Sequence, residues 1–247
     1  MEEFTVRSGS VPIPVTIAGD GPRALFVPGM SITRAGLGEL IDEFRRFLRL
    51  ATFDLRGHGD SGSADRYGYE AFAADTAAVT DALSDAGPVI MLGFSLGADL
   101  ALDQAAVRAE TPAVFLLDGG TPMTGPFLDE AELADMHDMI RESPPEQYDL
   151  TADQHVAALR EIDVHRRSAT QRFDAVTCPI TMIMSTSLAG TEGARAAELN
   201  DTWRHGVDDL VASRPAIEVH RLPGGHDMPL VHPRTIAEIV RERVARL

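Results

Sequence analysis

A serine between two glycines stands where an apolar run meets a helix-forming run. Residues 89–92 have the length and composition of a buried strand, Gly93-Phe94-Ser95-Leu96-Gly97 follows, and residues 98–108 have helical composition. Glycine on each side of Ser95 permits the sharp turn that raises a serine hydroxyl above the end of a sheet. Ser95 would then lie at a helix N-terminus, which favours developing negative charge. Because G-x-S-x-G also arises by chance in a chain with 21 glycines, the flanking strand and helix are what favour a nucleophile.

A serine nucleophile needs a base that takes its proton during attack. Among eight histidines, His226 lies in a Pro-Gly-Gly-His loop just after the last predicted strand, residues 217–222. In a parallel sheet this loop opens at the same edge as Ser95, so His226 is the candidate base. The alternative interpretation is a surface histidine in a turn. His220 and His232 lack this placement and are interpreted as structural.

The elements that must position these residues alternate between short apolar strands and helices. This alternation predicts an α/β fold with a mostly parallel sheet of about eight strands and helices on both faces. The predicted strands are residues 4–7, 11–17, 24–27, 50–53, 89–92, 113–117, 179–184 and 217–222. The predicted helices are residues 36–48, 69–83, 98–108, 193–212 and 233–247.

The alternation stops between residues 121 and 173, where acidic residues and methionines are frequent and no strand is evident. Helical spacing of apolar residues recurs at 129–141 and 152–166. We therefore expect one core domain made of residues 1–120 and 174–247, with residues 121–173 inserted as a helical cap over the carboxyl edge of the sheet. Helices packed at the side of the sheet are the alternative.

Composition limits the classes of partner. A net charge of −16 disfavours nucleic acids and anionic membrane surfaces as partners. The chain has one cysteine, Cys178, which excludes an intrachain disulfide framework and favours a reducing compartment. Neither a basic-then-apolar leader nor an apolar stretch near ~20 residues is visible, so a cytoplasmic location is expected.

Four motifs in this order resemble the α/β-hydrolase superfamily over nearly the whole chain. They are Pro28-Gly29-Met30 after a strand, Asp54-x-Arg56-Gly57-His58-Gly59-x-Ser61, the G-x-Ser95-x-G turn, and the late loop that ends in His226. The resemblance implies the α/β-hydrolase fold with Ser95 as nucleophile and His226 as base. It says little about the substrate, because this fold hosts many chemistries.

The imidazole also needs a carboxylate to orient it. In most members of the superfamily this acid follows the penultimate strand, a place that falls near Leu188, where the sequence has no acid. Some members supply it after the strand that follows the nucleophile helix, which here is Asp118. Asp118 is therefore the predicted acid, Glu192 is the second candidate, and a turn-forming aspartate is the structural alternative for Asp118.

The resemblance further implies an oxyanion hole formed by the backbone N–H groups of Met30 and Leu96. It implies a structural role for His58, Asp54 and Arg56. The apolar residues of the insertion are expected to line an adaptable substrate pocket. The predicted pocket residues are Met123, Phe127, Leu128, Leu133, Met136, Met139 and Ile140.

The sequence thus predicts a serine hydrolase that acts on a small to medium apolar carboxylic ester or lactone. The same triad could instead cleave a carbon–carbon bond or a thioester, and two non-enzymatic alternatives stay open: a small-molecule binder with an impaired triad, and an interaction module that uses the acidic insertion. No metal or other cofactor is expected, because no cluster of His, Cys and carboxylates has ligand spacing. A small molecule is the expected partner, and a homodimer is left open.

Overall fold

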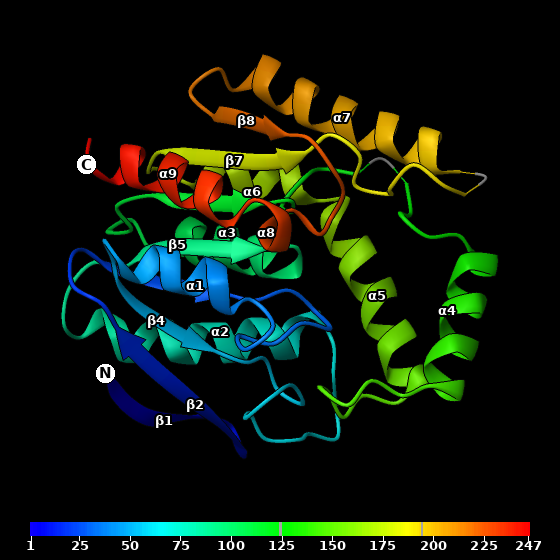
Figure 1. Ribbon diagram of the computed structural model, residues 1–247, viewed down its shortest axis with the longest axis horizontal. Coiled ribbons are helices and arrows are strands. Elements are labelled where there is room, and N and C mark those ends of the chain that lie inside the picture. Colours follow the sequence, from blue (N-terminus) through cyan, green and yellow to red (C-terminus); the bar gives the residue numbers. More distant parts are fainter. Residues whose placement is uncertain (124, 194) are drawn as a thin grey trace.

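The computed structural model describes residues 1–123, 125–193 and 195–247 and centres on one eight-stranded sheet (Figure 1). The strands are β1 (Glu2–Ser8), β2 (Val11–Ala18), β3 (Arg23–Val27), β4 (Arg49–Phe53), β5 (Ile90–Phe94), β6 (Val114–Leu117), β7 (Ile180–Ser185) and β8 (Glu218–Leu222). Their order across the sheet is β1-β2-β4-β3-β5-β6-β7-β8. β2 pairs antiparallel with β1 and β4, and all other neighbours are parallel. The predicted mostly parallel sheet is confirmed.

Helices cover both faces of this sheet. They are α1 (Gly38–Arg45), α2 (Tyr69–Ser84), α3 (Leu96–Val107), α4 (Glu130–Glu142), α5 (Ala152–Arg166), α6 (Ala169–Ala175), α7 (Ala196–Ser213), α8 (Met228–Val231) and α9 (Pro233–Val244). In Figure 1, α1, α8 and α9 lie in front of the sheet, and α2, α3 and α6 lie behind it.

Strand β6 shows how the two-residue side-chain period of a strand fills both layers. Val114 and Leu116 belong to the apolar cluster that includes side chains of α2 and α3. Phe115 and Leu117 belong to the cluster that includes side chains of α1 and α9. A strand buried on both faces is a continuous apolar run, which is why these short strands were recognisable in the sequence.

The insertion between β6 and β7 contains three helices. Helix α4 begins with a capping box formed by Asp129 and Glu132, and α5 begins with one formed by Thr151 and Gln154. In Figure 1, α4 and α5 pack together beyond the carboxyl ends of the strands, at the right of the view. Helix α6 instead packs against α3, and the predicted domain boundary at residue 173 falls inside it.

Polar contacts join α5 and the loop before it to the core. Glu161 accepts a hydrogen bond of 2.9 Å from the backbone N–H of Tyr69, the first residue of α2. Tyr148, in the loop before α5, forms an isolated antiparallel bridge with His58. These contacts hold α5 at a fixed place relative to the sheet edge. Within the part of the chain that the structure describes, no helix has both the length and the apolar character needed to cross a membrane.

Candidate active site

Ser95 occupies a strained turn between β5 and α3. Its backbone has φ 54° and ψ −120°, a left-handed conformation that non-glycine residues rarely adopt and that costs on the order of 1–3 kcal/mol. Its backbone N–H donates a 2.9 Å hydrogen bond to the carbonyl of Leu117, and its carbonyl accepts one of 3.0 Å from Ala98. The neighbouring strand and the first turn of α3 therefore hold the serine in this conformation.

The two glycines of the motif are required by close packing. A Cβ atom at Gly93 would overlap the backbone of Gly97, and one at Gly97 would overlap the carbonyl oxygen of Val27. Neither obstacle can move, because both are main-chain atoms of the central elements. Only glycine at both positions lets α3 start directly against β5 and β3.

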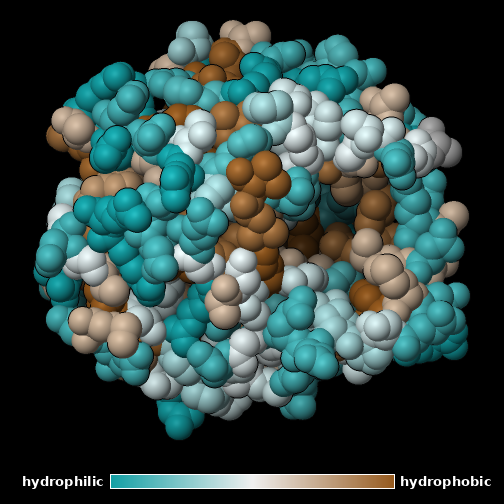
Figure 2. Space-filling view, in the orientation of Figure 1, coloured by the Kyte–Doolittle hydropathy of each residue, from teal (hydrophilic) through white to brown (hydrophobic). Residues whose placement is uncertain are grey.

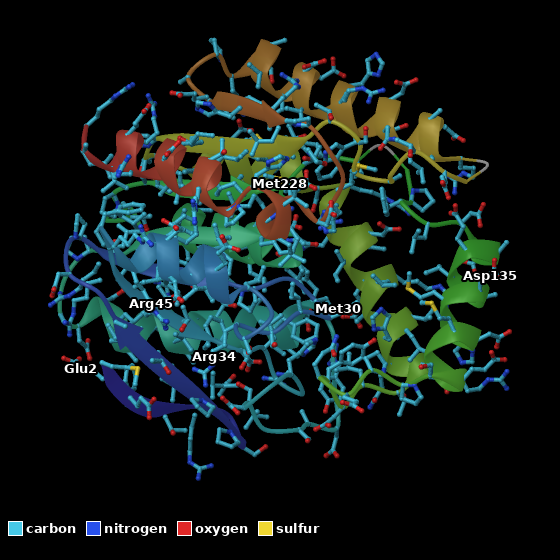
Figure 3. All side chains as sticks on the ribbon, in the orientation of Figure 1. Glu2, Met30, Arg34, Arg45, Asp135 and Met228 are labelled. Carbon is cyan, nitrogen blue, oxygen red and sulfur yellow. The ribbon has the colours of Figure 1, made fainter. Side chains whose placement is uncertain are left out.

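His226 and Ser95 are brought together from 131 residues apart. The Ser95 hydroxyl lies 2.9 Å from His226 Nε2, and the His226 ring packs beside Phe94 with 4.9 Å between the ring centroids. The loop that carries His226 is anchored by Met228, the first residue of α8, which is fully buried between α8 and the sheet and is labelled in Figure 3. This contact places the imidazole within reach of the serine proton.

Asp118 is the carboxylate that the structure brings to His226. His226 Nδ1–H donates to Asp118 Oδ2 at 2.8 Å, and the backbone N–H of Ser185 donates to Asp118 Oδ1 at 2.8 Å. The Asp118 residue is 1% exposed and has φ 46° at the end of β6. Both carboxylate oxygens are therefore engaged, which fixes the plane of the carboxylate and, through it, the imidazole tautomer with its proton on Nδ1.

The alternative acid, Glu192, is exposed, and of the two candidates only Asp118 hydrogen-bonds to His226 among the described residues. Leu188 occupies the place after β7 where the sequence lacks an acid, and its side chain lines the cavity described below. The structure thus brings Ser95, His226 and Asp118 together and leaves Glu192 apart.

Met30 and Leu96 flank the serine as expected for an oxyanion hole. Leu96 is the first residue of α3, and Met30 follows Gly29, where an added Cβ atom would come 3.0 Å from the Cβ of Ser95. Figure 3 labels Met30 at the side of the core that faces α5. Two backbone N–H groups thus border the space above Ser95, the arrangement that stabilises a developing oxyanion.

His58 has a structural role, as expected, but at a sensitive place. Its Nε2 accepts a 3.1 Å hydrogen bond from the backbone N–H of Ser31, and its Nδ1–H donates to the carbonyl of Arg56 at 3.0 Å. Burial lowers the pKa of His58, which keeps the ring neutral and Nε2 able to accept. Ser31 has φ 67°, so His58 holds a strained residue directly beside Met30.

The triad opens into a cavity of about 290 Å³ beneath α5. Figure 2 shows a deep hollow between the places of α8 and α5, with apolar residues on its walls. Its apolar lining residues are Met30, Leu96, Phe127, Leu128, Met136, Leu159, Ile162, Leu188 and Trp203. Its polar lining residues are Ser31, Ser95, Asp118, His155, Arg166 and His226.

The predicted pocket needs correction. Phe127, Leu128 and Met136 line the cavity as expected. Met123, Leu133 and Ile140 are buried side chains outside its lining, and Met139 is 60% exposed on α4. The error arose because the helical phase of α4 relative to the sheet cannot be obtained from a run of apolar residues in an acidic segment.

The cavity also contains residues that the sequence did not reveal. His155, Leu159, Ile162 and Arg166 follow one another at helical spacing along α5, and Trp203 comes from α7. The spacing of α5 was a usable signal, since its apolar face was recognised. The two polar residues at the ends of that face were not, because a polar residue on a helix normally faces water.

In the described residues no group of three or more His, Cys, Asp and Glu side chains could hold a metal ion. The arrangement is instead that of a hydrogen-bonded Ser-His-Asp chain at the floor of a mostly apolar cavity. Such an arrangement can generate a serine nucleophile and return its proton to a leaving group.

Comparison with known proteins identifies the family. The model of the family described as "Alpha/beta hydrolase family" matches residues 24–239. The chain belongs to the alpha/beta hydrolase family. No curated protein matches the sequence.

Several solved structures share the alpha/beta hydrolase fold of this chain. A thermophilic esterase from Thermogutta terrifontis superposes with a TM-score of 0.77 at 16% identity, covering 100% of this chain and 99% of its own. A variant of AqdC, described for recognition and ring-cleavage of the Pseudomonas quinolone signal, gives 0.74 at 21% identity and full coverage of both chains. A thioesterase domain from the curacin biosynthetic pathway gives 0.69 at 18% identity, covering 97% of this chain and 99% of its own. At these identities the likeness concerns the fold.

Proposed function

We propose that this alpha/beta hydrolase is a serine hydrolase that cleaves a small to medium apolar carboxylic ester or lactone through an acyl-enzyme. The observation that carries the proposal is the continuous hydrogen-bonded chain from Ser95 through His226 to Asp118, which opens into the cavity beneath α5. Each distance is 2.8–2.9 Å, within the range needed for proton transfer without rearrangement.

In the first half-reaction, Ser95 Oγ attacks the ester carbonyl while its proton passes to His226 Nε2. The negative charge that develops on the carbonyl oxygen is stabilised by the backbone N–H groups of Leu96 and Met30, each worth about 3 kcal/mol of barrier. His226 then gives the proton to the leaving oxygen as the carbon–oxygen bond breaks. Asp118 orients the imidazole and stabilises its cationic form throughout.

In the second half-reaction, water repeats these steps against the acyl-enzyme. His226 takes a proton from water as the new carbon–oxygen bond forms, and it returns that proton to Ser95 Oγ when the acid leaves. The products are a carboxylic acid and an alcohol, or a hydroxy acid from a lactone. No cofactor enters this scheme.

The apolar walls of the cavity support the choice of an apolar acyl or alcohol group. Phe127, Leu128 and Met136 come from the insertion, and Leu159 and Ile162 from α5. Burial of a methylene group against such walls contributes ~0.8 kcal/mol, so chain length would be selected by how well the cavity is filled. A volume of about 290 Å³ suits a substrate of modest size.

Carbon–carbon cleavage and thioester hydrolysis on the same triad are the second candidates. Among proteins of the same fold, one is described as a thioesterase domain and another for ring-cleavage of a quinolone. These names describe those proteins, and they justify including both chemistries in a test. A binder without activity is the third candidate, and its main support was the absence of an acid near Leu188, a function that Asp118 takes in this proposal.

The test is turnover of three matched substrates by wild type and Ser95→Ala: a p-nitrophenyl ester of a medium-chain acid, its thioester and a 1,3-diketone. The proposal predicts that the ester has the highest kcat/KM and that Ser95→Ala removes its turnover. Preference for the diketone or the thioester would replace the ester assignment by the corresponding chemistry. Absence of turnover for all three would favour the binder.

The expected cytoplasmic location and the open question of a homodimer stay predictions. Size-exclusion chromatography with light scattering would settle whether two chains associate.

A further inference from the structure

Helix α5 presents an unusual face to the cavity. His155, Leu159, Ile162 and Arg166 are spaced by four, three and four residues, so they share one side of the helix, and all four line the cavity. The two middle residues suit an apolar substrate. Arg166 does not, because a guanidinium charge facing an apolar ligand would lose hydration without gaining a partner.

The position of Arg166 is fixed by a buried carboxylate next to the nucleophile. Arg166 Nε donates to Asp99 Oδ2 at 2.9 Å, and Nη2 lies 2.9 Å from the same oxygen. Asp99 is fully buried in the first turn of α3, one helical turn after Ser95. These contacts hold the guanidinium beside the part of the cavity that contains the reacting carbonyl, instead of letting it reach solvent.

Asp99 does not use the full hydrogen-bonding capacity of Arg166. A guanidinium has five N–H donors in a planar fork, and Asp99 engages Nε and Nη2. Nη1 donates to no side chain or carbonyl within residues 1–123, 125–193 and 195–247, and Arg166 is 12% exposed. The remaining donors are therefore available to a group inside the cavity.

The local charge balance permits a further anion. Three carboxylates and three guanidinium groups influence one another here: Asp99, Asp103, Asp163, Arg166, Arg167 and Arg172. Asp103 is paired with Arg172 at 2.9 Å, and Asp163 accepts the backbone N–H of Phe127 at 3.1 Å. The group is formally neutral, and its carboxylates already have donors of their own.

A second residue of the cavity points to a ligand with acceptor oxygens. Trp203 is 2% exposed and lines the cavity, and its Nε1–H has no hydrogen-bond partner among the described residues. Buried donors are nearly always paired in folded proteins, so an unpaired one that lines a binding cavity indicates an acceptor on the ligand. Asp118, the carboxylate that the described lining contains, has both of its oxygens engaged.

We propose that the substrate of this hydrolase carries a carboxylate that Arg166 binds through Nη1, so that the enzyme cleaves half-esters of short dicarboxylic acids or lactones that bear a free acid. The inference rests on the proposed function and adds the class of substrate. Leu159 and Ile162 contact the apolar spacer between the carboxylate and the ester, and Trp203 Nε1–H donates to a further oxygen of the substrate.

The test compares two p-nitrophenyl esters of similar length, the half-ester of glutaric acid and the ester of valeric acid, which differ by a carboxylate in place of a methyl group. For wild type, kcat/KM is expected to be at least tenfold higher for the glutarate half-ester. Arg166→Gln should lower the glutarate-to-valerate ratio by about tenfold, mainly through KM, because a charge-assisted hydrogen bond to the substrate is lost.

Two variants make the result interpretable. Arg160→Gln removes an arginine whose side chain is 52% exposed on the same helix, and it should keep the wild-type ratio. Because Arg166→Gln leaves Asp99 with a poorer partner, the double variant Arg166→Gln/Asp99→Asn removes both charges, and it should lose the ratio to the same extent as the single variant.

Valerate turnover that equals or exceeds glutarate turnover in wild type would overturn the carboxylate site and leave the serine hydrolase intact. A ratio that survives Arg166→Gln would overturn the assignment to Arg166. Failure to hydrolyse either ester, together with failure of a neutral fluorophosphonate to label Ser95, would instead refute the proposed function on which this inference rests.

Discussion

At the scale of single residues, the acid of the triad is the most informative case. Leu188 stands where most members of the superfamily have the acid, and Asp118 is the predicted replacement because it ends a strand next to the nucleophile. The structure gives the physical reason why this place works: β6 is the immediate neighbour of β5, and the carboxylate at its end reaches His226 Nδ1 at 2.8 Å. The sequence could predict this contact because both residues follow strands whose order was predictable.

His58 provides a prediction at the same scale. His58→Ala removes the acceptor for the Ser31 N–H and leaves that strained residue free to move Met30, so kcat for a neutral ester should fall by roughly tenfold while KM changes little. In His58→Gln the amide oxygen can accept the same N–H, and part of the loss should be recovered. Steady-state kinetics of the three proteins decide the matter, and a kcat for His58→Ala equal to wild type would mean that Ser31 needs no such support.

At the scale of helices and strands, strands were predictable to within a few residues because each is a short apolar run buried on both faces. The insertion was harder. Its helices α4 and α5 were recognisable from their spacing, yet the residues they turn toward Ser95 depend on how α4 and α5 pack against the core. Arg166 and Trp203 could not be predicted for this reason, since their roles come from contacts between distant elements.

Two methionines of α4 test the corrected pocket. Met136 lines the cavity and Met139 is 60% exposed, although only three residues separate them. Met136→Lys should lower kcat/KM for a medium-chain ester by at least about tenfold, because a charged side chain replaces an apolar wall. Met139→Lys should have kinetics within about twofold of wild type. Equal effects of the two substitutions would show that α4 is placed differently in solution.

The contact between α3 and β3 gives a prediction for stability. Gly97→Ala would force a methyl group against the carbonyl of Val27, so it should lower the free energy of unfolding by at least ~2 kcal/mol. Gly38→Ala, at the start of α1 with open space around its Cβ, should be neutral or slightly stabilising. Urea denaturation of both variants measures this difference, and similar values for the two would contradict the close packing of the turn.

At the scale of the whole molecule, the insertion and the core are joined through buried aromatic rings. Tyr148, from the loop before α5, stacks between His58 of the core and His155 of α5, with 5.3 Å and 5.6 Å between ring centroids. Burial, followed by the nearby His58, lowers the pKa of His155 from 6.5 to about 4, and burial also lowers the pKa of His58. Both rings are therefore neutral in the folded protein at pH 7.

This stack predicts acid sensitivity. Below pH 6.5 the unfolded chain binds protons that the folded chain does not, so the free energy of unfolding should fall as the pH drops from 6.5 to about 4. The slope should reach at most about 1.4 kcal/mol per pH unit for each histidine. Urea unfolding at pH 7.5 and 5.0 should show a smaller loss for His155→Gln than for wild type, whereas the exposed His205→Gln should match wild type. An identical loss in all three proteins would exclude His155 as a source.

The central claim is that Ser95 is a nucleophile activated through His226 and Asp118, and the most direct measurement of it is the intact mass after treatment with a fluorophosphonate. We expect wild type to gain one probe mass, Ser95→Ala to gain none, and Asp118→Asn to react more slowly by about 10³–10⁴-fold. Glu192→Gln, which alters the exposed alternative acid, should react like wild type. An unlabelled wild type, or an Asp118→Asn protein that is labelled at the wild-type rate, would contradict this account of the site.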